Sequence, residues 1–219
     1  ILENNYYRLV LDTRGGIGKS MQLKNFNHTK PRLTLSTWFP FLTSFLGPDY
    51  QDEVIEENLV QMFGNHLDEA PPFFQEFKDD PNTTKQFRKT VFAASEDYAV
   101  YNSKNGNPII KLTSPIVNGI QMIKTFEAVQ DSYILKFSVQ LINRSREIKP
   151  LKPLYFFGEQ RLADNGGGMH QVSHEGPVFF YDESLQTENT EDIGNELTVT
   201  MMKWLGLEDQ YFIGAVAPK

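Results

Sequence analysis

The segment TRGGIGKS, residues 13–20, ends in the Gly-Lys-Ser sequence that closes a Walker A phosphate-binding motif. Such a loop needs a glycine five residues before its Gly-Lys pair, so that backbone N–H groups can surround the phosphates. It also needs a helix directly afterwards, because the helix N-terminus supplies part of the anion site. Thr13 occupies the glycine position, and Met21, Leu23 and Phe26 with polar residues between them favour a strand. The sequence therefore argues against phosphate binding here.

The same segment has a structural interpretation. Arg14, Gly15 and Gly16 follow the apolar run 9–11 and precede the strand-like pattern. Hairpin turns require positive φ, which glycine adopts without steric cost. We therefore predict a hairpin turn at residues 14–16, with Gly15 and Gly16 fixing its geometry.

Two further groups of residues could do chemistry. His170 and His174 have the four-residue spacing of zinc ligands on a helix. Glycines on both sides leave little room for a helix, and in an extended chain the two residues are about 13 Å apart, too far for one metal. Glu159 follows an apolar strand and could be a general acid or base, but no second group of suitable placement is identifiable. We predict no catalytic residue, no cofactor and no metal site.

The composition excludes several further classes of site and function. The 219 residues include no cysteine, which excludes thiolate zinc sites, catalytic thiols and disulfides. The formal net charge of −7, with no run of Lys or Arg, argues against a surface for nucleic acid or anionic membrane. The most apolar window, residues 38–46, is too short to cross a bilayer.

Strand patterns dominate the chain. Residues 133–142 alternate strictly between apolar and polar, residues 120–129 alternate as well, and 130–132 form the expected hairpin connection. Further strand candidates are residues 6–11, 19–26, 85–94, 98–103, 108–112, 153–158, 177–182, 196–202 and 211–217. Short strands separated by turn residues predict a mostly β, antiparallel sandwich or barrel that forms a single domain over residues 1–219.

Helical patterns are few. Residues 52–63 and 203–210 could each form a short helix. Residues 64–83, 163–177 and 182–196 are rich in Pro, Gly or acidic residues and are expected to be mobile surface loops.

The C-terminal stretch, residues 201–219, contains Trp204 and the pair Tyr211–Phe212 around a short helix-like turn followed by a strand. Core packing that locks the helix to the sheet is one interpretation of these rings. A partly exposed aromatic patch used for docking is the other.

Three segments resemble one known family. They are residues 10–26 (VLDTRGGIGKSMQLKNF), 123–145 (IKTFEAVQDSYILKFSVQLINRS) and 203–218 (KWLGLEDQYFIGAVAP). In this order they resemble the first hairpin, the central hairpin and the aromatic C-terminal part of the large periplasmic domain of YidC. YidC is the bacterial inner-membrane insertase of the Oxa1 superfamily.

The resemblance implies an antiparallel β-supersandwich similar to galactose mutarotases, with short helices, one of them near the C-terminus. It implies a non-catalytic domain that faces the periplasm of the bacterial inner membrane and is tethered by flanking helices outside this chain. Family members continue with further strands, so the domain is expected to be truncated at its C-terminal end.

Implied partners are the SecDF–SecYEG translocon and nascent membrane proteins, with chaperone-like binding. In this interpretation Gly15 and Gly16 fix the first hairpin. The candidates for holding the C-terminal helix and contacting partners are Trp204, Leu207, Tyr211 and Phe212.

Two alternatives remain open. A carbohydrate-binding or mutarotase-like sandwich would need a Glu base and a His acid in one cleft, for which Glu159 with His170 or His174 is the available pairing. A secreted structural module or adhesin would instead occur in tandem copies or behind a signal peptide.

Overall fold

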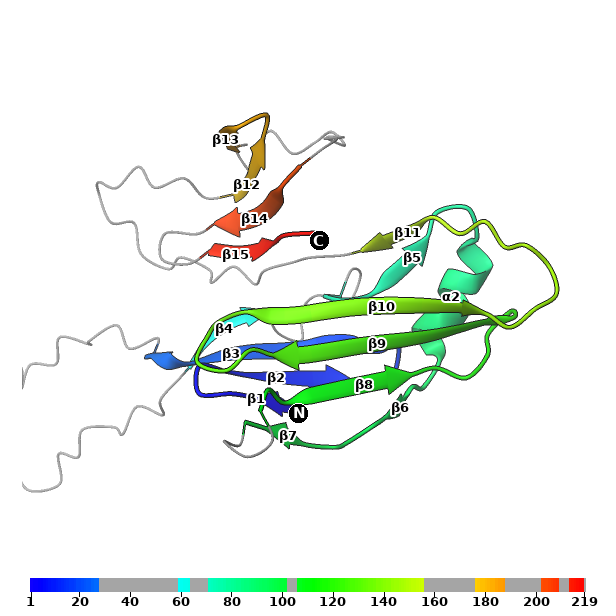
Figure 1. The fold of residues 1–219 in the computed structure, drawn as a ribbon, viewed down its shortest axis with the longest axis horizontal. Helices are drawn as coiled ribbons and strands as arrows, with labels where there is room; N and C mark the ends of the chain where they lie inside the picture. The colour runs from blue at the N-terminus through cyan, green and yellow to red at the C-terminus, as the bar shows by residue number, and fades with distance from the viewer. Residues whose placement is uncertain are drawn as a thin grey trace, which may run out of the picture.

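The computed structural model describes residues 1–27, 59–63, 71–101, 106–155, 176–187, 202–208 and 213–218. In these ranges the chain forms strands β1 to β15 and one helix, α2 (Figure 1). The strands pair antiparallel, except that β1 pairs parallel with β7. The predicted mostly β, antiparallel fold is confirmed. The similarity to galactose mutarotases stays a prediction.

The first sheet has the strand order β4-β3-β2-β1-β7. Its strands are β1 Leu2–Glu3, β2 Tyr7–Asp12, β3 Ile17–Asn27, β4 Leu59–Phe63 and β7 Ala99–Val100. A hairpin turn joins β2 to β3, with Asp12 opposite Ile17 and φ values of 75° at Gly15 and 60° at Gly16. The predicted hairpin is confirmed, and the strand that follows it rules out a P-loop helix.

The second sheet has the order β10-β9-β8-β6. Its strands are β6 Ala93–Ala94, β8 Ile109–Thr113, β9 Ile120–Ala128 and β10 Leu135–Asn143. The β9–β10 register runs without a shift from Leu135 opposite Ala128 to Asn143 opposite Ile120. The predicted central hairpin is confirmed.

The core lies between the two sheets, which Figure 1 shows stacked face to face. Alternate residues of β9 are buried, as a period-two strand with one core face requires. The inward apolar side chains of the two sheets include Leu2, Tyr7, Leu9, Leu23, Ile110, Leu112, Met122 and Phe126. This shared core is what defines the sandwich.

Helix α2, Pro81–Lys89, lies at one end of the sandwich, beside the small ribbon of β5 Gln75–Phe77 and β11 Pro153–Tyr155 (Figure 1). The predicted strand over residues 85–94 is therefore wrong for its first half. Asp80 caps the helix by accepting a hydrogen bond from the Thr83 N–H at 3.0 Å, and Pro81 suits the first helical turn. The predicted loop 64–83 also contains β5 and the start of α2.

A separate sheet with the order β13-β12-β14-β15 contains the C-terminal strands. They are β12 Gly176–Tyr181, β13 Ser184–Thr187, β14 Trp204–Glu208 and β15 Ile213–Val216. We call these four strands the C-terminal sheet. It confirms the strand predicted at 177–182 and, over residues 213–216, the strand predicted at 211–217, while β13 lies inside the predicted loop 182–196.

The helix predicted at residues 203–210 is wrong, because β14 occupies residues 204–208. Gly206 lies between Val178 of β12 and Ala215 of β15. A Cβ at Gly206 would come 3.0 Å from the Gly214 carbonyl oxygen, so this position suits close strand packing.

The helix predicted at residues 52–63 is wrong over residues 59–63. These residues pair with β3 as strand β4, which buries Val60 and Phe63. Residues 52–58, the predicted strand 196–201 and the loop segment 163–175 lie outside the described residues. In the described part of the chain, no helix has both the length and the apolar character needed to cross a bilayer.

Candidate functional site

Three places in the described structure are candidates for a functional site, because they hold residues singled out above or line a groove. They are the clamp formed by Gly15, Gly16 and Lys124, the C-terminal sheet, and a groove beside α2. The described residues contain no group of three or more His, Cys, Asp or Glu side chains placed to hold a metal ion. Glu159, His170 and His174 lie outside the described residues, so their pairing stays untested.

The clamp is built around Lys124, a lysine on the buried face of β9 that is only 1% exposed. Its Nζ donates hydrogen bonds to the carbonyl oxygens of Gly15 at 3.0 Å, Gly16 at 2.7 Å and Phe73 at 3.0 Å. An ammonium group has three N–H donors and no acceptor, so three carbonyls match it. The Phe92 ring centroid lies 5.3 Å from Nζ.

Burial lowers the pKa of Lys124 from its ordinary value of 10.5 to about 7. The three carbonyls oppose this effect, because they accept hydrogen bonds from the charged form. The contacts join the β2–β3 turn of one sheet and the loop at Phe73 to the middle strand of the other sheet. Lys124 thus holds the layers of the sandwich in one arrangement.

The predicted role of Gly15 and Gly16 in the first hairpin agrees with their positions. The Gly15 N–H donates to the Thr90 carbonyl at 2.8 Å, which links the turn to the end of α2. A Cβ at Gly16 would lie 3.3 Å from Lys124 Cδ and 3.4 Å from Phe92 Cδ1. Glycine is therefore needed both for positive φ and for the close approach of Lys124.

Sequence reasoning missed Lys124, although its signal was present. In residues 120–128 the buried positions alternate, and Lys124 falls in phase with Met122 and Phe126. A lysine in the apolar phase of a strand predicts a buried cation that needs hydrogen-bond acceptors.

A second polar group that the sequence did not reveal lies at the N-terminus. Asn4 is buried, and its amide nitrogen donates to the carbonyls of Val129 at 2.8 Å and Ser132 at 2.9 Å. Its amide oxygen accepts from the N–H groups of Tyr6 and Tyr7, both at 2.9 Å. Asn4 thereby fixes the β9–β10 turn against the first sheet.

Glu3, next to Asn4, has three side-chain partners. Lys24 lies at 2.5 Å, Arg8 at 2.8 Å and the Tyr98 hydroxyl at 2.9 Å. Burial alone would raise the pKa of Glu3, but the hydrogen bonds from Lys24, Arg8 and Tyr98 outweigh it and lower that pKa. The group is an ion-pair network that supports the fold.

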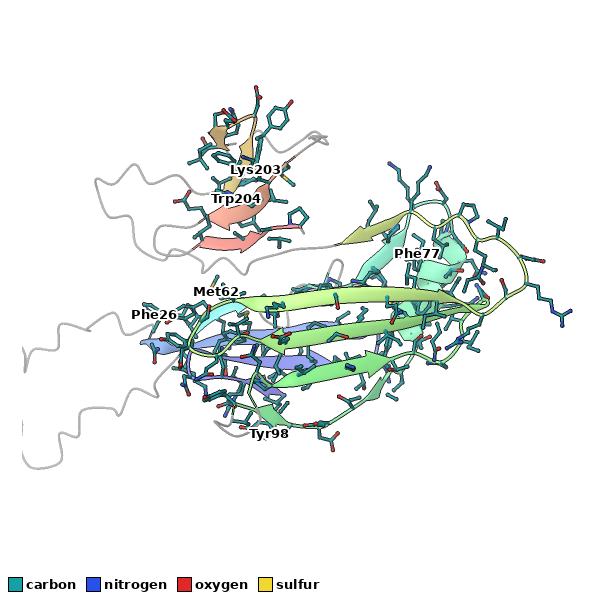
Figure 2. The ribbon with its side chains drawn as sticks, viewed as in Figure 1. Phe26, Met62, Phe77, Tyr98, Lys203 and Trp204 are labelled. Atoms are coloured by element: carbon teal, nitrogen blue, oxygen red, sulfur yellow. The ribbon has the colours of Figure 1, made fainter. Side chains whose placement is uncertain are left out.

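The C-terminal sheet holds two of the predicted contact residues. Trp204 stacks on Phe180 of β12, with ring centroids 6.4 Å apart and planes 14° apart. Lys203 Nζ lies 5.3 Å from the Phe180 centroid. Figure 2 shows Lys203 and Trp204 next to each other at this sheet. Leu207 is half-buried and lies opposite Pro177 and Gly214. Trp204 and Leu207 therefore pack within a set of paired strands. The expectation that they hold a C-terminal helix in place is wrong. Tyr211 and Phe212 lie outside the described residues.

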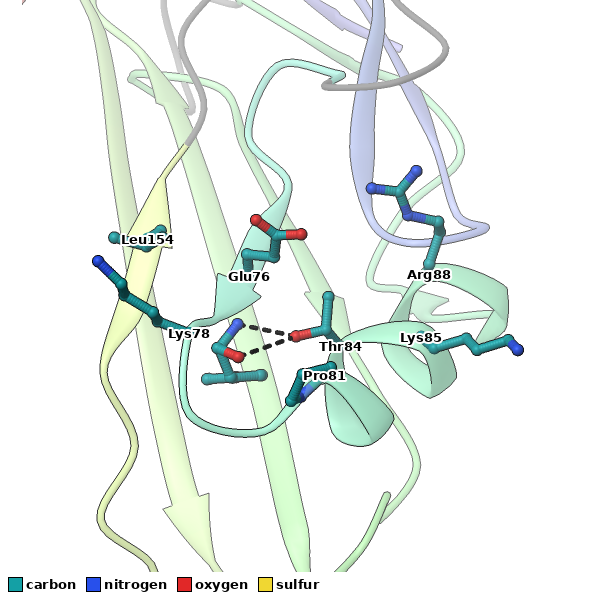
Figure 3. Close-up of a pocket in the computed structure, with 8 residues that line it drawn as sticks. Glu76, Lys78, Pro81, Thr84, Lys85, Arg88 and Leu154 are labelled. Atoms are coloured by element: carbon teal, nitrogen blue, oxygen red, sulfur yellow. Dashed lines mark hydrogen bonds between the residues drawn. The ribbon is translucent and has the colours of Figure 1, made fainter. Parts of the chain in front are cut away.

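The groove beside α2 has a volume of about 580 Å³ (Figure 3). We call it the α2 groove. It is lined by Glu76, Phe77, Lys78, Pro81, Thr84, Lys85, Arg88 and Leu154. Lys78 and Leu154 lie on the side of the β5–β11 ribbon, Lys85 and Arg88 project from α2, and Glu76 lies between them. The fold thus gathers cations that no sequence run revealed.

Comparison with known proteins gives two findings. The family model described as "YidC periplasmic domain" matches residues 45–219. A protein of Thiobacillus denitrificans named "Membrane protein insertase YidC" is 23% identical over 231 aligned positions, which cover 100% of this chain and 36% of that protein. The chain therefore spans about a third of the length of that relative.

Proposed function

The chain belongs to the YidC periplasmic domain family, and from this premise we propose that it is the non-catalytic, periplasm-facing domain of a membrane protein insertase. The observation that carries the proposal is the match of residues 45–219 to that family, with the relative aligned over the whole chain. The predicted resemblance to this family is confirmed. Three segments suggested this family. Residues 123–145 and 203–218 lie inside the range that the family model matches, and residues 10–26 lie inside the alignment with the Thiobacillus denitrificans protein.

The described structure is consistent with a scaffold whose surface contacts other proteins. Its buried polar groups, such as Lys124 and Asn4, are bonded to the protein's own backbone and so serve the fold. Several large apolar side chains are exposed instead, among them Ile116, Ile148 and Leu185. Scattered exposed apolar residues are ordinary on their own, so they provide positions for testing contacts and do not themselves identify a partner.

The proposed partners are components of the SecDF–SecYEG translocon and nascent membrane proteins. Ile116 and Ile148 belong to loops near α2, since Asn118 Nδ2 donates to Thr83 Oγ1 at 2.9 Å and the Arg144 N–H donates to the Gly119 carbonyl at 2.7 Å. Trp204 and Leu207 provide a second candidate surface on the C-terminal sheet. Membrane helices outside this chain would tether the domain and perform the insertion.

The orientation can be tested with a single cysteine, because the chain contains none. Ile148 is 95% exposed, so Ile148→Cys places a thiol in solvent without disturbing the core. In the full-length protein, a membrane-impermeant maleimide should label this thiol in intact spheroplasts. The protein without the added cysteine is the control for labelling elsewhere. Labelling that needs lysis of the cells would refute a periplasmic orientation.

Partner contacts can be tested by a photo-crosslinking amino acid at Ile148, Ile116, Leu185 or Trp204 in the full-length protein. We expect cross-links to a translocon subunit or to a nascent membrane protein from at least one position, identified by mass spectrometry. Lys111, an exposed position on β8, serves as a comparison site. A protein that accumulates normally but cross-links to neither class at any position would contradict the partner proposal.

A further inference from the structure

The charged side chains that line the α2 groove are mainly cations, whereas the chain as a whole has a negative net charge. The chain has a formal net charge of −7, yet the groove is lined by three cations, Lys78, Lys85 and Arg88, and one carboxylate, Glu76. All three cations are exposed, while Glu76 is half-buried. Charge gathered against the overall sign raises the local concentration of an oppositely charged ligand.

The floor and edge of the groove are built from packed side chains and capped backbone. Phe77 and Thr84 are buried, and Leu154 and Pro81 are exposed to the opening. Asp80 occupies the N-terminus of α2 through its bond to the Thr83 N–H at 3.0 Å. The helix end is therefore already capped and does not supply an anion site.

The backbone of β5 at this point is also already bonded. The Phe77 N–H donates to Thr84 Oγ1 at 2.8 Å, and Thr84 Oγ1 lies 3.4 Å from the Phe77 carbonyl oxygen, as the dashed lines in Figure 3 show. A ligand therefore cannot pair with Phe77 as an added strand. Recognition must come from the side chains that line the groove.

We propose that the α2 groove binds an extended acidic segment of a partner protein. Carboxylates of the segment pair with Lys78 on the ribbon side and with Lys85 on the helix side, while apolar groups contact Leu154 and Pro81. Arg88 already lies over the Phe74 ring, with its guanidinium carbon 4.7 Å from the centroid. That contact holds the guanidinium of Arg88 in position.

The arrangement favours a peptide over an anionic membrane surface. The cations lie on two walls with Glu76 between them (Figure 3). A flat layer of lipid phosphates would meet Glu76 together with the cations, whereas a peptide can place its carboxylates on the walls and neutral groups at Glu76. Repulsion between Glu76 and the lipid phosphates therefore disfavours the membrane surface, whereas a peptide can avoid this repulsion.

The test measures binding of the 219-residue chain to a fluorescent peptide made of Asp, Glu and Leu, by anisotropy. Lys78→Glu/Lys85→Glu reverses one cation on each wall and should weaken binding about tenfold. The matched control, Lys19→Glu/Lys111→Glu, makes the same change in net charge at exposed lysines outside the groove. It should bind the peptide like the wild type.

A third variant moves binding in the opposite direction. Glu76→Gln removes the carboxylate between the walls and should tighten binding about threefold. Tighter binding by a Glu76→Gln chain with an unchanged circular dichroism spectrum does not come from lost folding, so this variant keeps the test decisive if the double reversal lowers stability. Raising the salt concentration from about 0.01 M to about 0.15 M should weaken binding to the wild type.

Three results would overturn the proposal. The first is equal binding of a peptide in which Asn and Gln replace Asp and Glu. The second is equal weakening by the groove and control reversals, which would make the effect one of net charge. The third is binding to phosphatidylglycerol vesicles that depends on Lys78 and Lys85 in the absence of peptide binding.

The inference deepens the proposed function and rests on it only in assuming that the domain contacts other proteins. The two fail separately. Loss of peptide binding in the purified chain leaves the orientation and cross-linking results in cells untouched. Cross-linking that finds no translocon or nascent partner leaves the measured affinity for an acidic peptide unchanged.

Discussion

Apart from the parallel β1–β7 pair, the sandwich and the C-terminal sheet are both antiparallel β-structure, but they bury their side chains differently. In the sandwich, two sheets face each other, and Phe126 on β9 is fully buried against Phe73 and Phe137. In the C-terminal sheet, Val178 and Phe179 are the large apolar side chains that are buried among the described residues. Strand β13 is exposed at all of its positions.

The polar contacts differ in the same way. The sandwich buries Lys124 and Asn4, and each is bonded to backbone groups distant in the sequence. Among the residues described in the C-terminal sheet, the strands pair with one another and Trp204 stacks on Phe180. Buried polar groups that find partners in only one arrangement specify that arrangement, because any other leaves them unsatisfied. Lys124 and Asn4 therefore help to specify the arrangement of the sandwich.

The largest expected effect comes from truncating one phenylalanine in each region. Phe126→Ala should lower the free energy of unfolding by about 4 kcal/mol, because it opens a cavity among Phe73, Phe137 and their neighbours. Phe180→Ala should cost about 1 kcal/mol, since Phe180 is half-buried and its main ring contact is Trp204. Urea unfolding followed by circular dichroism measures both.

This pair also tests whether the comparison holds. Equal losses for Phe126→Ala and Phe180→Ala would mean that the C-terminal sheet unfolds as one cooperative unit with the sandwich. Hydrogen exchange separates the cases: Phe180→Ala should raise exchange in β12 and β14 and leave β9 protected.

The next effect concerns the buried cation. Lys124→Met should lower the free energy of unfolding at pH 7 by about 3 kcal/mol, because the carbonyls of Gly15, Gly16 and Phe73 lose their shared donor. Lys111→Met, at an exposed position of the neighbouring strand, should change stability by about 0.5 kcal/mol or less. A Lys124→Met chain as stable as the wild type would show that apolar packing replaces the clamp at no cost.

The pH dependence of the free energy of unfolding gives a further test of the buried state of Lys124. The unfolded chain holds this proton up to a pKa near 10.5, whereas the folded chain releases it near pH 7. Between these values the unfolded state binds more protons than the folded state. The free energy of unfolding therefore rises steadily as the pH is raised from 7 toward 10.5. The stability difference between wild type and Lys124→Met should therefore widen by about 2 kcal/mol from pH 7 to pH 9.

Subtracting the variant removes groups that titrate alike in both proteins, so urea titrations of the two chains at each pH isolate Lys124. A constant difference across this range would mean that the three carbonyls keep the ammonium charged above pH 9. In that case hydrogen bonding outweighs desolvation in setting the pKa.

The sequence predicts most of this fold where the pattern is local and long. Alternation over residues 120–129 and 133–142 identifies the central hairpin correctly, and Gly15 and Gly16 identify the first turn. The same alternation places Lys124 on the inner face. Its acceptors cannot be found in this way, because Gly15 is 109 residues away in the sequence.

The errors fall where segments are short or where two signals compete. Residues 204–208 form too short an apolar run for periodicity to separate helix from strand, and pairing with β12 and β15 decides in favour of the strand. Residues 85–89 follow the Asp80–Pro81 start signal of a helix, which outweighs their strand-like alternation. The α2 groove is a product of tertiary structure, since Lys78 lies in the turn after β5 and Leu154 lies in β11.

The smallest expected effect compares two glycines that both have positive φ. Gly16 has φ 60° and a hypothetical Cβ 3.3 Å from Lys124 Cδ, whereas Gly106 has φ 71° and no atom within 4 Å of its Cβ. Gly106→Ala should cost about 1 kcal/mol through backbone strain alone. Gly16→Ala should cost about 1 kcal/mol more, because Lys124 and Phe92 must also move. Urea unfolding of the two variants measures this difference. If their losses are equal, the Lys124 side chain gives way freely, and the clamp is less rigid than the rest of the sandwich core.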